Sequence, residues 1–488
     1  MPSSVQSRYM RLWAILLLPA PLCGQPLRNR IEAAIASTTE SRQAHWGIRI
    51  VDLATGKVIY SVNENRFFTP ASNAKLFSTG LALTRLGPDH RFVTKVVANV
   101  LPDAEGQVGE LRIVGGGDPN LSGRVLPYSR EAEPGNSLEA IEALADSVVA
   151  RGVKRVLRDV IGDDTAYIWE PYPDGWAVDD TTWEYGAPVS ALIVNDNAFR
   201  LTLTPSSELG GPAEIAISPE FESLVIHNRT RTTEAETNVA IERLPGSGEL
   251  LVSGPVAKKD VSLLAVDDPA LVAANLLRDA LLKRGVSIPN GARALHRTNP
   301  AVPAEAAGVT LAERTSLPLI EDLRIVNKES QNLHAEIALR EVARVANGVG
   351  SRKGGLVELQ KWLEEISIGK NEYAIYDGSG LSRLTLITPL AISKLLIHMY
   401  ATAHREAWLS TLPVGGVDGT LYRRFDQRPK ASQILAKTGT LSHVSTLAGY
   451  ALRKKGGIYA FSIMVDHFTG ESRQARKAID RIALALVN

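Results

Sequence analysis

Residues 70 to 83 read Pro70-Ala71-Ser72-Asn73-Ala74-Lys75-Leu76-Phe77-Ser78-Thr79-Gly80-Leu81-Ala82-Leu83. Helix-forming residues and the apolar positions in this run predict a helix that begins at Ser72. Because positions i and i+3 lie on one face of a helix, we expect the Ser72 hydroxyl and the Lys75 amine to lie within hydrogen-bond reach. A serine next to an amine that can take its proton has the parts of a nucleophile and a base.

The start of a helix suits this chemistry, because its unpaired N–H groups and its positive dipole end favour the oxyanion that forms at an attacked carbonyl. Lys75 can act as a base only if its pKa is lowered, and we expect burial and the neighbouring cation Lys437 to lower it. A solvated helix with an ordinary serine and lysine is the alternative. Ser367-Ile368-Gly369-Lys370 matches the same spacing, but it follows a predicted helix and is interpreted as a loop.

A second polar motif, Ser330-Gln331-Asn332, falls between predicted helices at residues 318–327 and 333–345. Side chains on such a short turn can project into a cleft. Ser330 could pass a proton to a leaving amine, and Asn332 could hold a substrate amide. Taken alone, the tripeptide is more typical of a helix cap than of a catalytic element, because Ser and Asn are favoured at helix starts.

The third motif, Lys437-Thr438-Gly439-Thr440, precedes two strand-like runs at residues 447–452 and 457–465. This arrangement predicts the edge strand of an antiparallel sheet. Gly439 would let another backbone approach closely, while Lys437 and the hydroxyls of Thr438 and Thr440 could bind a terminal carboxylate. The backbone N–H groups of Thr440 and Ser72 would form an oxyanion hole. A surface turn is the alternative.

In this order the three motifs resemble those of the penicillin-recognising serine enzymes. More narrowly, the chain resembles the class C low-molecular-mass penicillin-binding proteins of the D-alanyl-D-alanine carboxypeptidase/endopeptidase family. Further stretches that resemble this family are spread over almost the whole chain, at residues 115–119, 161–164, 188–192, 195–197, 377–383 and 416–421.

Spacing between the motifs predicts how the domains are arranged. Ser330 lies 258 positions after Ser72 (330 − 72), which requires a large insertion between the first two motifs. The class C proteins that this chain resembles also have such an insertion. We therefore predict an α+β fold with a split transpeptidase/β-lactamase-like catalytic domain at residues 25–90 and 262–488. Its antiparallel sheet would carry helices and a helical subdomain. Residues 91–261 would form strand-rich inserted domains, one nested in another.

The resemblance implies a serine DD-peptidase acting on D-alanyl-D-alanine or on D-alanyl-diamino acid cross-links of peptidoglycan stem peptides. It assigns catalytic roles to Ser72, Lys75, Ser330, Asn332 and Lys437, and substrate binding to Thr438, Gly439 and Thr440. β-Lactam antibiotics would be covalent inhibitors, and no cofactor or metal is implied. A β-lactamase or esterase, and a non-catalytic peptidoglycan-binding protein, are the alternatives.

The N-terminus predicts where the chemistry occurs. Arg8 and Arg11 precede a short apolar run at residues 12–22, which is typical of a secretory signal peptide spanning residues 1–24. The protein would then be secreted across the inner membrane and be periplasmic or cell-wall associated. A peripheral association with the membrane or the cell wall is compatible with this prediction. Cys23 is the only cysteine, so after cleavage a mature chain would have no thiol for a disulfide, a zinc site or a nucleophile.

Composition is typical of a globular enzyme. The 488 residues are 44% hydrophobic and carry a formal charge of +1, which offers no general footprint for nucleic acid. The segment from Ser129 to Gly135 is the best candidate for a flexible link.

Other enzyme classes lack their signatures. There is no His-Glu-x-x-His zinc motif, His334 and Glu336 lack the i, i+4 spacing of helical ligands, and Gly378-Ser379-Gly380 has the wrong spacing for a nucleophile elbow. We interpret the last as a tight turn, which the resemblance places near the cleft. Gly115-Gly116-Gly117-Asp118 lacks a phosphate-loop ending and is interpreted as a loop after a strand.

Overall fold

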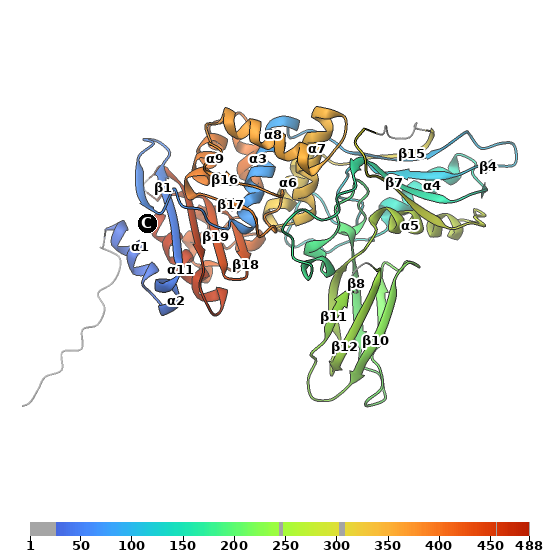
Figure 1. Ribbon diagram of the computed structural model, residues 1–488, viewed down its shortest axis with the longest axis horizontal. Helices are drawn as coiled ribbons and strands as arrows, with labels where there is room; N and C mark the ends of the chain where they lie inside the picture. The colour runs from blue at the N-terminus through green and yellow to red at the C-terminus, as the bar shows by residue number, and fades with distance from the viewer. Residues whose placement is uncertain (1–25, 244–246, 302–307, 455, 488) are drawn as a thin grey trace, which may run out of the picture.

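The computed structural model describes residues 26–243, 247–301, 308–454 and 456–487. Figure 1 shows an elongated molecule in which the first and last parts of the chain lie together at one end. The middle of the chain forms the other end, from which a small group of strands projects. The predicted signal peptide at residues 1–24, including Cys23, lies outside the described residues.

A five-stranded antiparallel sheet, ordered β18-β19-β20-β1-β2, joins the two ends of the chain. Its strands are β18 (Ile434–Leu441), β19 (Val444–Leu452), β20 (Ile458–Asp466), β1 (His45–Asp52) and β2 (Val58–Val62). Strands β1 and β2 form an antiparallel hairpin, and the structure confirms that the third motif lies on an edge strand, β18.

Alternate residues of the central strands point to two different cores, which explains why helices cover both faces. Leu447 and Phe461 pack with α1 (Leu27–Ile35) and α11 (Ser472–Leu486). Ala448 and Ala460 face the other side, toward α9 (Pro389–Ala401). The final helix, α11, packs beside the first, α1. A short helix, α2 (Thr39–Gln43), lies next to α11.

The helical subdomain is built around α3 (Lys75–Leu86), whose first nine residues are all buried. An α-helix that is buried on every side has neighbours all round. These include α6 (Leu319–Lys328), α7 (Asn332–Asn347) and α8 (Arg352–Glu365). Helix α10 (Arg405–Thr411) packs on α6 and α9, and the short strands β16 (Tyr373–Ala374) and β17 (Leu386–Ile387) pair with each other. Ser72 belongs to a 3₁₀ turn at Ala71–Ala74, so the α-helix itself begins three residues later than predicted.

The inserted part has its own mixed sheet and its own core. Its order is β14-β7-β5-β3-β15, with strands β14 (Ala292–Arg297), β7 (Val160–Ile168), β5 (Leu111–Val114), β3 (Val93–Ala98) and β15 (Val309–Thr315). Helices α4 (Glu139–Ala150) and α5 (Pro269–Lys283) pack together against it. Two short strands, β4 (Gln107–Val108) and β6 (Arg155–Val156), pair with each other beside this sheet.

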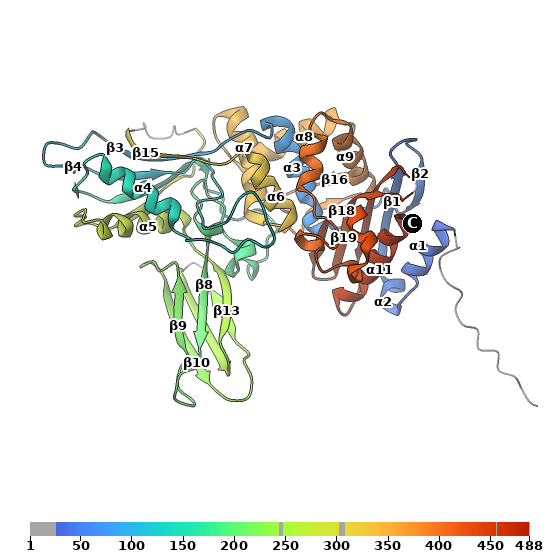
Figure 2. The same cartoon turned by 180° about the vertical axis from the view of Figure 1, so that it is seen from behind.

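The projecting strands form two three-stranded sheets, which Figure 2 shows from behind. One is ordered β13-β8-β9, from β13 (Asp260–Ala265), β8 (Ala198–Thr204) and β9 (Glu214–Ser218). The other is ordered β10-β12-β11, from β10 (Val225–Thr232), β12 (Glu249–Val256) and β11 (Ala240–Arg243). This nested module lies within the larger insertion along the chain.

The sheets bear on where the insertion ends. The sequence boundary at residue 262 assigns α5, β14 and β15 to the catalytic domain, yet α5 packs on β7, and both strands belong to the inserted sheet. An amphipathic helix and two strands look alike in sequence whichever sheet they join. We therefore propose a second boundary near Ser316, where the chain leaves β15 for α6.

The described residues contain no helix with the length and apolarity needed to span a bilayer.

Candidate active site

Ser72 and Lys75 meet as their spacing predicts. The Lys75 Nζ lies 2.9 Å from the Ser72 Oγ, and Ser72 is half-buried while Lys75 is fully buried. The turn that carries Ser72 is tight, because Ala71 has a φ of 46° and the carbonyl of Pro70 accepts a hydrogen bond from the Thr446 hydroxyl. Strand β19 therefore holds the backbone that presents the serine.

The Lys75 amine has two further acceptors, the Asn332 Oδ1 at 2.5 Å and the Ser379 carbonyl at 2.7 Å. Burial lowers the pKa of Lys75 to about 7, although the carboxylates of Asp377 and Glu336 oppose that shift. A neutral amine has two N–H groups and one lone pair. It can donate to Asn332 and Ser379 while its lone pair accepts the Ser72 proton.

The second motif begins in a sharp turn between α6 and α7. Ser330 has a φ of 66°, a conformation that few non-glycine residues adopt, so the surroundings must hold the turn. Its hydroxyl accepts a hydrogen bond from the Lys437 Nζ at 2.8 Å. Asn332 is the first residue of α7, and its Nδ2 donates to the Tyr185 carbonyl at 2.7 Å. The Gln331 side chain caps α7.

Lys437 lies in β18 with its side chain fully buried. Burial, and then the charge of Lys75, hold the pKa of Lys437 well below its usual value. The predicted lowering of the Lys75 pKa by burial is found, but Lys437 is not among the groups that shift the pKa of Lys75. Burial is the largest cause at both lysines.

Gly439 makes the close approach that its residue type predicts. A Cβ at this position would lie 2.2 Å from the Thr446 Oγ1 and 2.7 Å from the Pro70 carbonyl oxygen. Only glycine therefore allows β18 to pass this close to the Ser72 turn.

The two threonines of the third motif occupy different settings. The Thr438 Oγ1 donates to the Thr420 Oγ1 at 2.8 Å, whereas the exposed Thr440 lines a cavity with Ser72. Thr420 belongs to the 416–421 stretch, and it places a third hydroxyl beside the motif.

That cavity has a volume of about 430 Å³. Ser72, Ser330, Asn332 and Thr440 lie on its wall with Tyr185, and its other lining residues are Asp179, Asp180, Gly380, Leu381, Arg383, Leu441 and Ser442. The structure thus brings the five predicted catalytic residues together in two neighbouring hydrogen-bonded groups. Lys75 bonds to Ser72 and Asn332, and Lys437 bonds to Ser330. Lys437, Thr438 and Gly439 are not among the lining residues, but Lys437 bonds to Ser330, which lines the cavity.

Two buried carboxylates organise the turn that receives the Lys75 amine. The Glu336 Oε1 accepts the backbone N–H groups of Gly378 and Ser379 at 2.8 and 2.9 Å. Asp377 accepts the N–H groups of Gly380 and Ser382, closing the turn. The predicted tight turn is confirmed, and it contacts the catalytic lysine directly.

His334 is fully buried in α7 between two carboxylates. Its Nδ1 lies 2.6 Å from Asp322 and its Nε2 lies 2.9 Å from Asp196. Burial would lower its pKa, but the two carboxylates raise it to about 9, so His334 is an imidazolium at neutral pH. Among the described residues no group of three or more His, Cys, Asp or Glu side chains could hold a metal ion.

Sequence reasoning did not single out Tyr185, Glu336 and Thr420 as site residues. The stretches at 377–383 and 416–421 carried a signal through the resemblance, but Tyr185 and Glu336 are joined to the site only by tertiary contacts.

The similarity of this chain to known proteins extends over all of the elements that form the site. Residues 27–486 match the D-Ala-D-Ala carboxypeptidase 3 (S13) family. The chain belongs to this family. It is 33% identical over 477 residues to a D-alanyl-D-alanine carboxypeptidase of Actinomadura sp. (strain R39), covering 94% of this chain and 84% of the relative. It is 25% identical to D-alanyl-D-alanine carboxypeptidase DacB of Haemophilus influenzae, covering 86% and 85%.

The fold of this chain is also similar to that of a penicillin-binding protein of known structure. The crystal structure of penicillin binding protein 4 (dacB) from Haemophilus influenzae matches with a TM-score of 0.79 at 22% identity, covering 93% of this chain and 97% of that one. The predicted α+β class is thereby confirmed, and family membership shows a serine-type D-Ala-D-Ala carboxypeptidase. The expected resemblance to low-molecular-mass penicillin-binding proteins is also confirmed.

Proposed function

We propose that this S13 carboxypeptidase works through a Ser72 acyl-enzyme on peptidoglycan stem peptides. The observation that carries the proposal is the fully buried Lys75 amine, 2.9 Å from the Ser72 Oγ, with a pKa of about 7. At neutral pH a large fraction of Lys75 is an uncharged base, which an exposed lysine would not be.

The acylation step moves one proton and exchanges one bond. Lys75 takes the Ser72 proton as the Oγ forms a bond to the carbonyl carbon of the penultimate D-alanine. The N–H groups of Ser72 and Thr440 stabilise the oxyanion. The carbon–nitrogen bond then breaks, and the proton passes through Ser330 to the departing amine.

Deacylation reverses the roles with water. A water molecule gives a proton to Lys75, its oxygen bonds to the acyl carbon, and the ester bond to Ser72 breaks with return of the proton to Oγ. Asn332 orients the peptide amide throughout. Lys437, Thr438 and Thr440 hold the carboxylate that ends the substrate, with Gly439 allowing the strand to approach.

The leaving group distinguishes two peptidase activities. If it is free D-alanine, the enzyme is a carboxypeptidase; if it is a cross-linking diamino acid, the enzyme is an endopeptidase. We propose both for this site. A β-lactam would acylate Ser72 in the same way, and its tethered fragment would block water. The crystal structure of the Haemophilus influenzae protein in complex with a β-lactam has the same fold, with a TM-score of 0.75.

We also propose that the protein acts outside the inner membrane, in the periplasm or at the cell wall, because residues 1–24 are typical of a signal peptide. That location is where peptidoglycan lies.

Fluorescent-penicillin labelling followed by peptide mapping tests the proposal. We expect the label on the peptide that contains Ser72, and we expect Ser72→Ala to lose labelling and peptide hydrolysis by a factor of about 10³ or more. Ser78→Ala is the matched control, because Ser78 lies in α3 one turn beyond Lys75 and its hydroxyl donates to the Gly378 carbonyl and not to Ser72. A label elsewhere, or a Ser72→Ala enzyme of full activity, would contradict the mechanism.

A further inference from the structure

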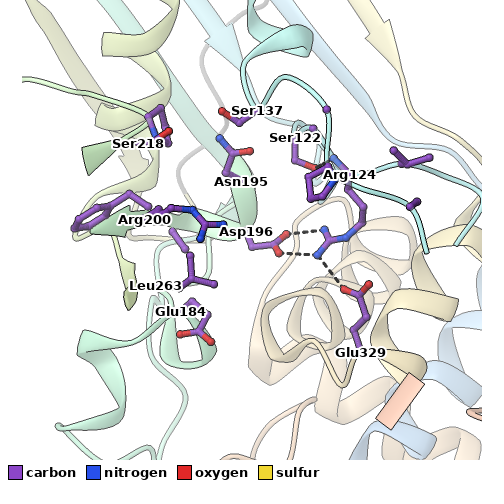
Figure 3. Close-up of a pocket in the computed structure, with 18 of the residues that line it drawn as sticks. Ser122, Arg124, Ser137, Glu184, Asn195, Asp196, Arg200, Ser218, Leu263 and Glu329 are labelled. Carbon is purple, nitrogen blue, oxygen red and sulfur yellow. Dashed lines mark hydrogen bonds and ion pairs between the residues drawn. The ribbon is translucent and has the colours of Figure 1, made fainter. Parts of the chain in front are cut away.

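A second cavity, of about 460 Å³, lies in the inserted part directly behind the active-site wall. Figure 3 shows residues that line it, among them Arg124, Glu184, Arg200 and Glu329. Glu329 precedes Ser330, and Glu184 precedes Tyr185, so two chain segments present one residue to each cavity. The two cavities therefore share a wall.

The loop at residues 122–137 forms much of this second cavity, and it is tied to the elements that hold a leaving group. The Tyr128 hydroxyl accepts the backbone N–H of Gly419, next to Thr420. Arg124 donates to Glu329 at 3.2 Å, next to Ser330. Ser330 and Thr438 are the groups proposed above to protonate the leaving amine and bind its carboxylate. The second cavity thus adjoins the site on its leaving-group side.

The lining has the chemistry of a peptide-binding surface. Hydroxyls of Ser122, Ser129, Ser137 and Ser218 can bond to peptide amides, and the half-exposed Val125 and Leu263 offer apolar contact. Arg124 is engaged by Asp196 and Glu329. Arg200 is exposed and makes no ion pair with another described residue, so its guanidinium is available for a carboxylate.

We propose that this cavity binds the second stem peptide of a cross-linked substrate, the strand that departs with the diamino acid. The inference rests on the endopeptidase function proposed above and gives it a location. A leaving group that is a free D-alanine is short. Its carboxylate would bind at Thr438 and Thr440, and no part of it would reach the second cavity. A cross-linked leaving group continues past them as a peptide with carboxylates, amides and short aliphatic side chains, which the lining matches.

The stretch at residues 129–135 therefore has a defined place. Expected from composition to be a flexible link, it is held by the Gly135 N–H, which donates to the Gly123 carbonyl at 2.7 Å. Arg130 also lies over the Tyr422 ring at 3.9 Å. Both contacts fix the loop as a wall of the cavity.

The test compares two substrates on the full-length enzyme, a monomeric peptide ending in D-alanyl-D-alanine and a dimer joined through a D-alanyl-diamino acid cross-link. Leu263→Trp should fill the cavity, and Arg200→Ala should remove its free cation; these residues are cross-strand partners in β13 and β8. We expect each to lower kcat/KM for the dimer about tenfold while monomer hydrolysis and penicillin labelling stay within about twofold. Val261→Trp is the matched control, two residues along β13, similarly exposed and outside the cavity lining.

Equal loss on both substrates, or no loss on either, would overturn the assignment of the cavity. The failures of the two proposals are separable. A wild-type enzyme that cleaves the monomer but never the dimer overturns this inference and the endopeptidase activity, yet leaves the Ser72 mechanism intact. Failure of Ser72→Ala to abolish monomer hydrolysis overturns the mechanism itself.

Discussion

The charge on one lysine sets the pH range in which this site can work. Lys75 is fully buried and has three oxygen neighbours, so each protonation state has a defined bonding pattern. The ammonium donates to all three. The neutral amine donates to two and accepts from Ser72, which is the pattern that the reaction needs.

Acylation should therefore rise with pH around neutrality. Because burial lowers the pKa of Lys75 to about 7, the base is mostly protonated and inactive below that value and mostly neutral above it. We expect the second-order rate of penicillin acylation to increase about fivefold from pH 6 to pH 7, as the neutral fraction of Lys75 rises, and to level off above pH 8. Stopped-flow labelling across this range measures it. A flat profile between pH 5 and 8 would exclude Lys75 as the base.

Glu336 should tune that profile. Its carboxylate raises the pKa of Lys75, opposing burial, so Glu336→Gln should lower the pKa of the base. We expect the acidic limb of the acylation profile to move by about half a unit toward lower pH. A merely structural role would lower the rate without moving the limb.

Glu341→Gln is the matched control for Glu336→Gln. Glu341 is equally buried on α7, but it bonds to His90, Tyr167 and Arg344 and not to the turn at residues 377–382. Its loss should leave the limb in place. Equal movement in both variants would mean that the shift comes from a general change in the fold.

At the scale of elements, the features predicted well are those that depend on local pattern. The helices on either side of Ser330, α6 and α7, and the strands β19 and β20 after the third motif follow from apolar periodicity and turn residues. The beginning of α3 was misplaced by three residues, because the 3₁₀ turn around Ser72 is imposed by β18 and β19, and no local pattern encodes that contact.

Strand β18 should not tolerate a side chain at Gly439. A Cβ there meets the Thr446 hydroxyl and the Pro70 carbonyl, so Gly439→Ala must push the strand away from the Ser72 turn. We expect acylation to fall about 100-fold and the free energy of unfolding to fall by about 1–3 kcal/mol. Penicillin labelling rates and urea denaturation measure the two effects.

Gly291→Ala is the matched control for that substitution. A Cβ at Gly291 has open space around it, and the residue needs no left-handed conformation. It should change neither the labelling rate nor the stability measurably. If Gly439→Ala is as active as Gly291→Ala, the close approach of β18 has no part in catalysis.

Across the whole molecule, the sequence predicted which residues share the site but could not predict what supports them. Three motifs and their order were enough to bring Ser72, Ser330 and Lys437 together. Tyr185, from the inserted part, meets Asn332 through a backbone carbonyl, and such a contact leaves no trace in residue type or spacing. The second boundary of the insertion was missed for the same reason, since strand pairing is a long-range choice.

A partly buried ion network joins the insertion to the turn that carries Ser330. Arg124 holds Asp196 through two hydrogen bonds and Glu329 through a third. Burial would raise the pKa of Asp196, but Arg124 and His334 hold that pKa well below its usual range. Removing one cation from such a network leaves a buried carboxylate only partly compensated.

Arg124→Met should therefore affect stability and catalysis together. We expect a loss of about 2–4 kcal/mol in the free energy of unfolding, since Asp196 then depends on His334 alone. We also expect slower acylation, because the Glu329–Ser330 turn loses a contact that supports its left-handed conformation.

Arg284→Met is the control, because Arg284 makes a comparable bidentate pair with Asp146 at the exposed surface of the insertion, where the pair contributes little to stability. Denaturant unfolding and penicillin labelling of both variants compare the two sites. If Arg124→Met behaves like Arg284→Met in both, the insertion does not support the catalytic turn, and its part in this enzyme is confined to binding the polymer.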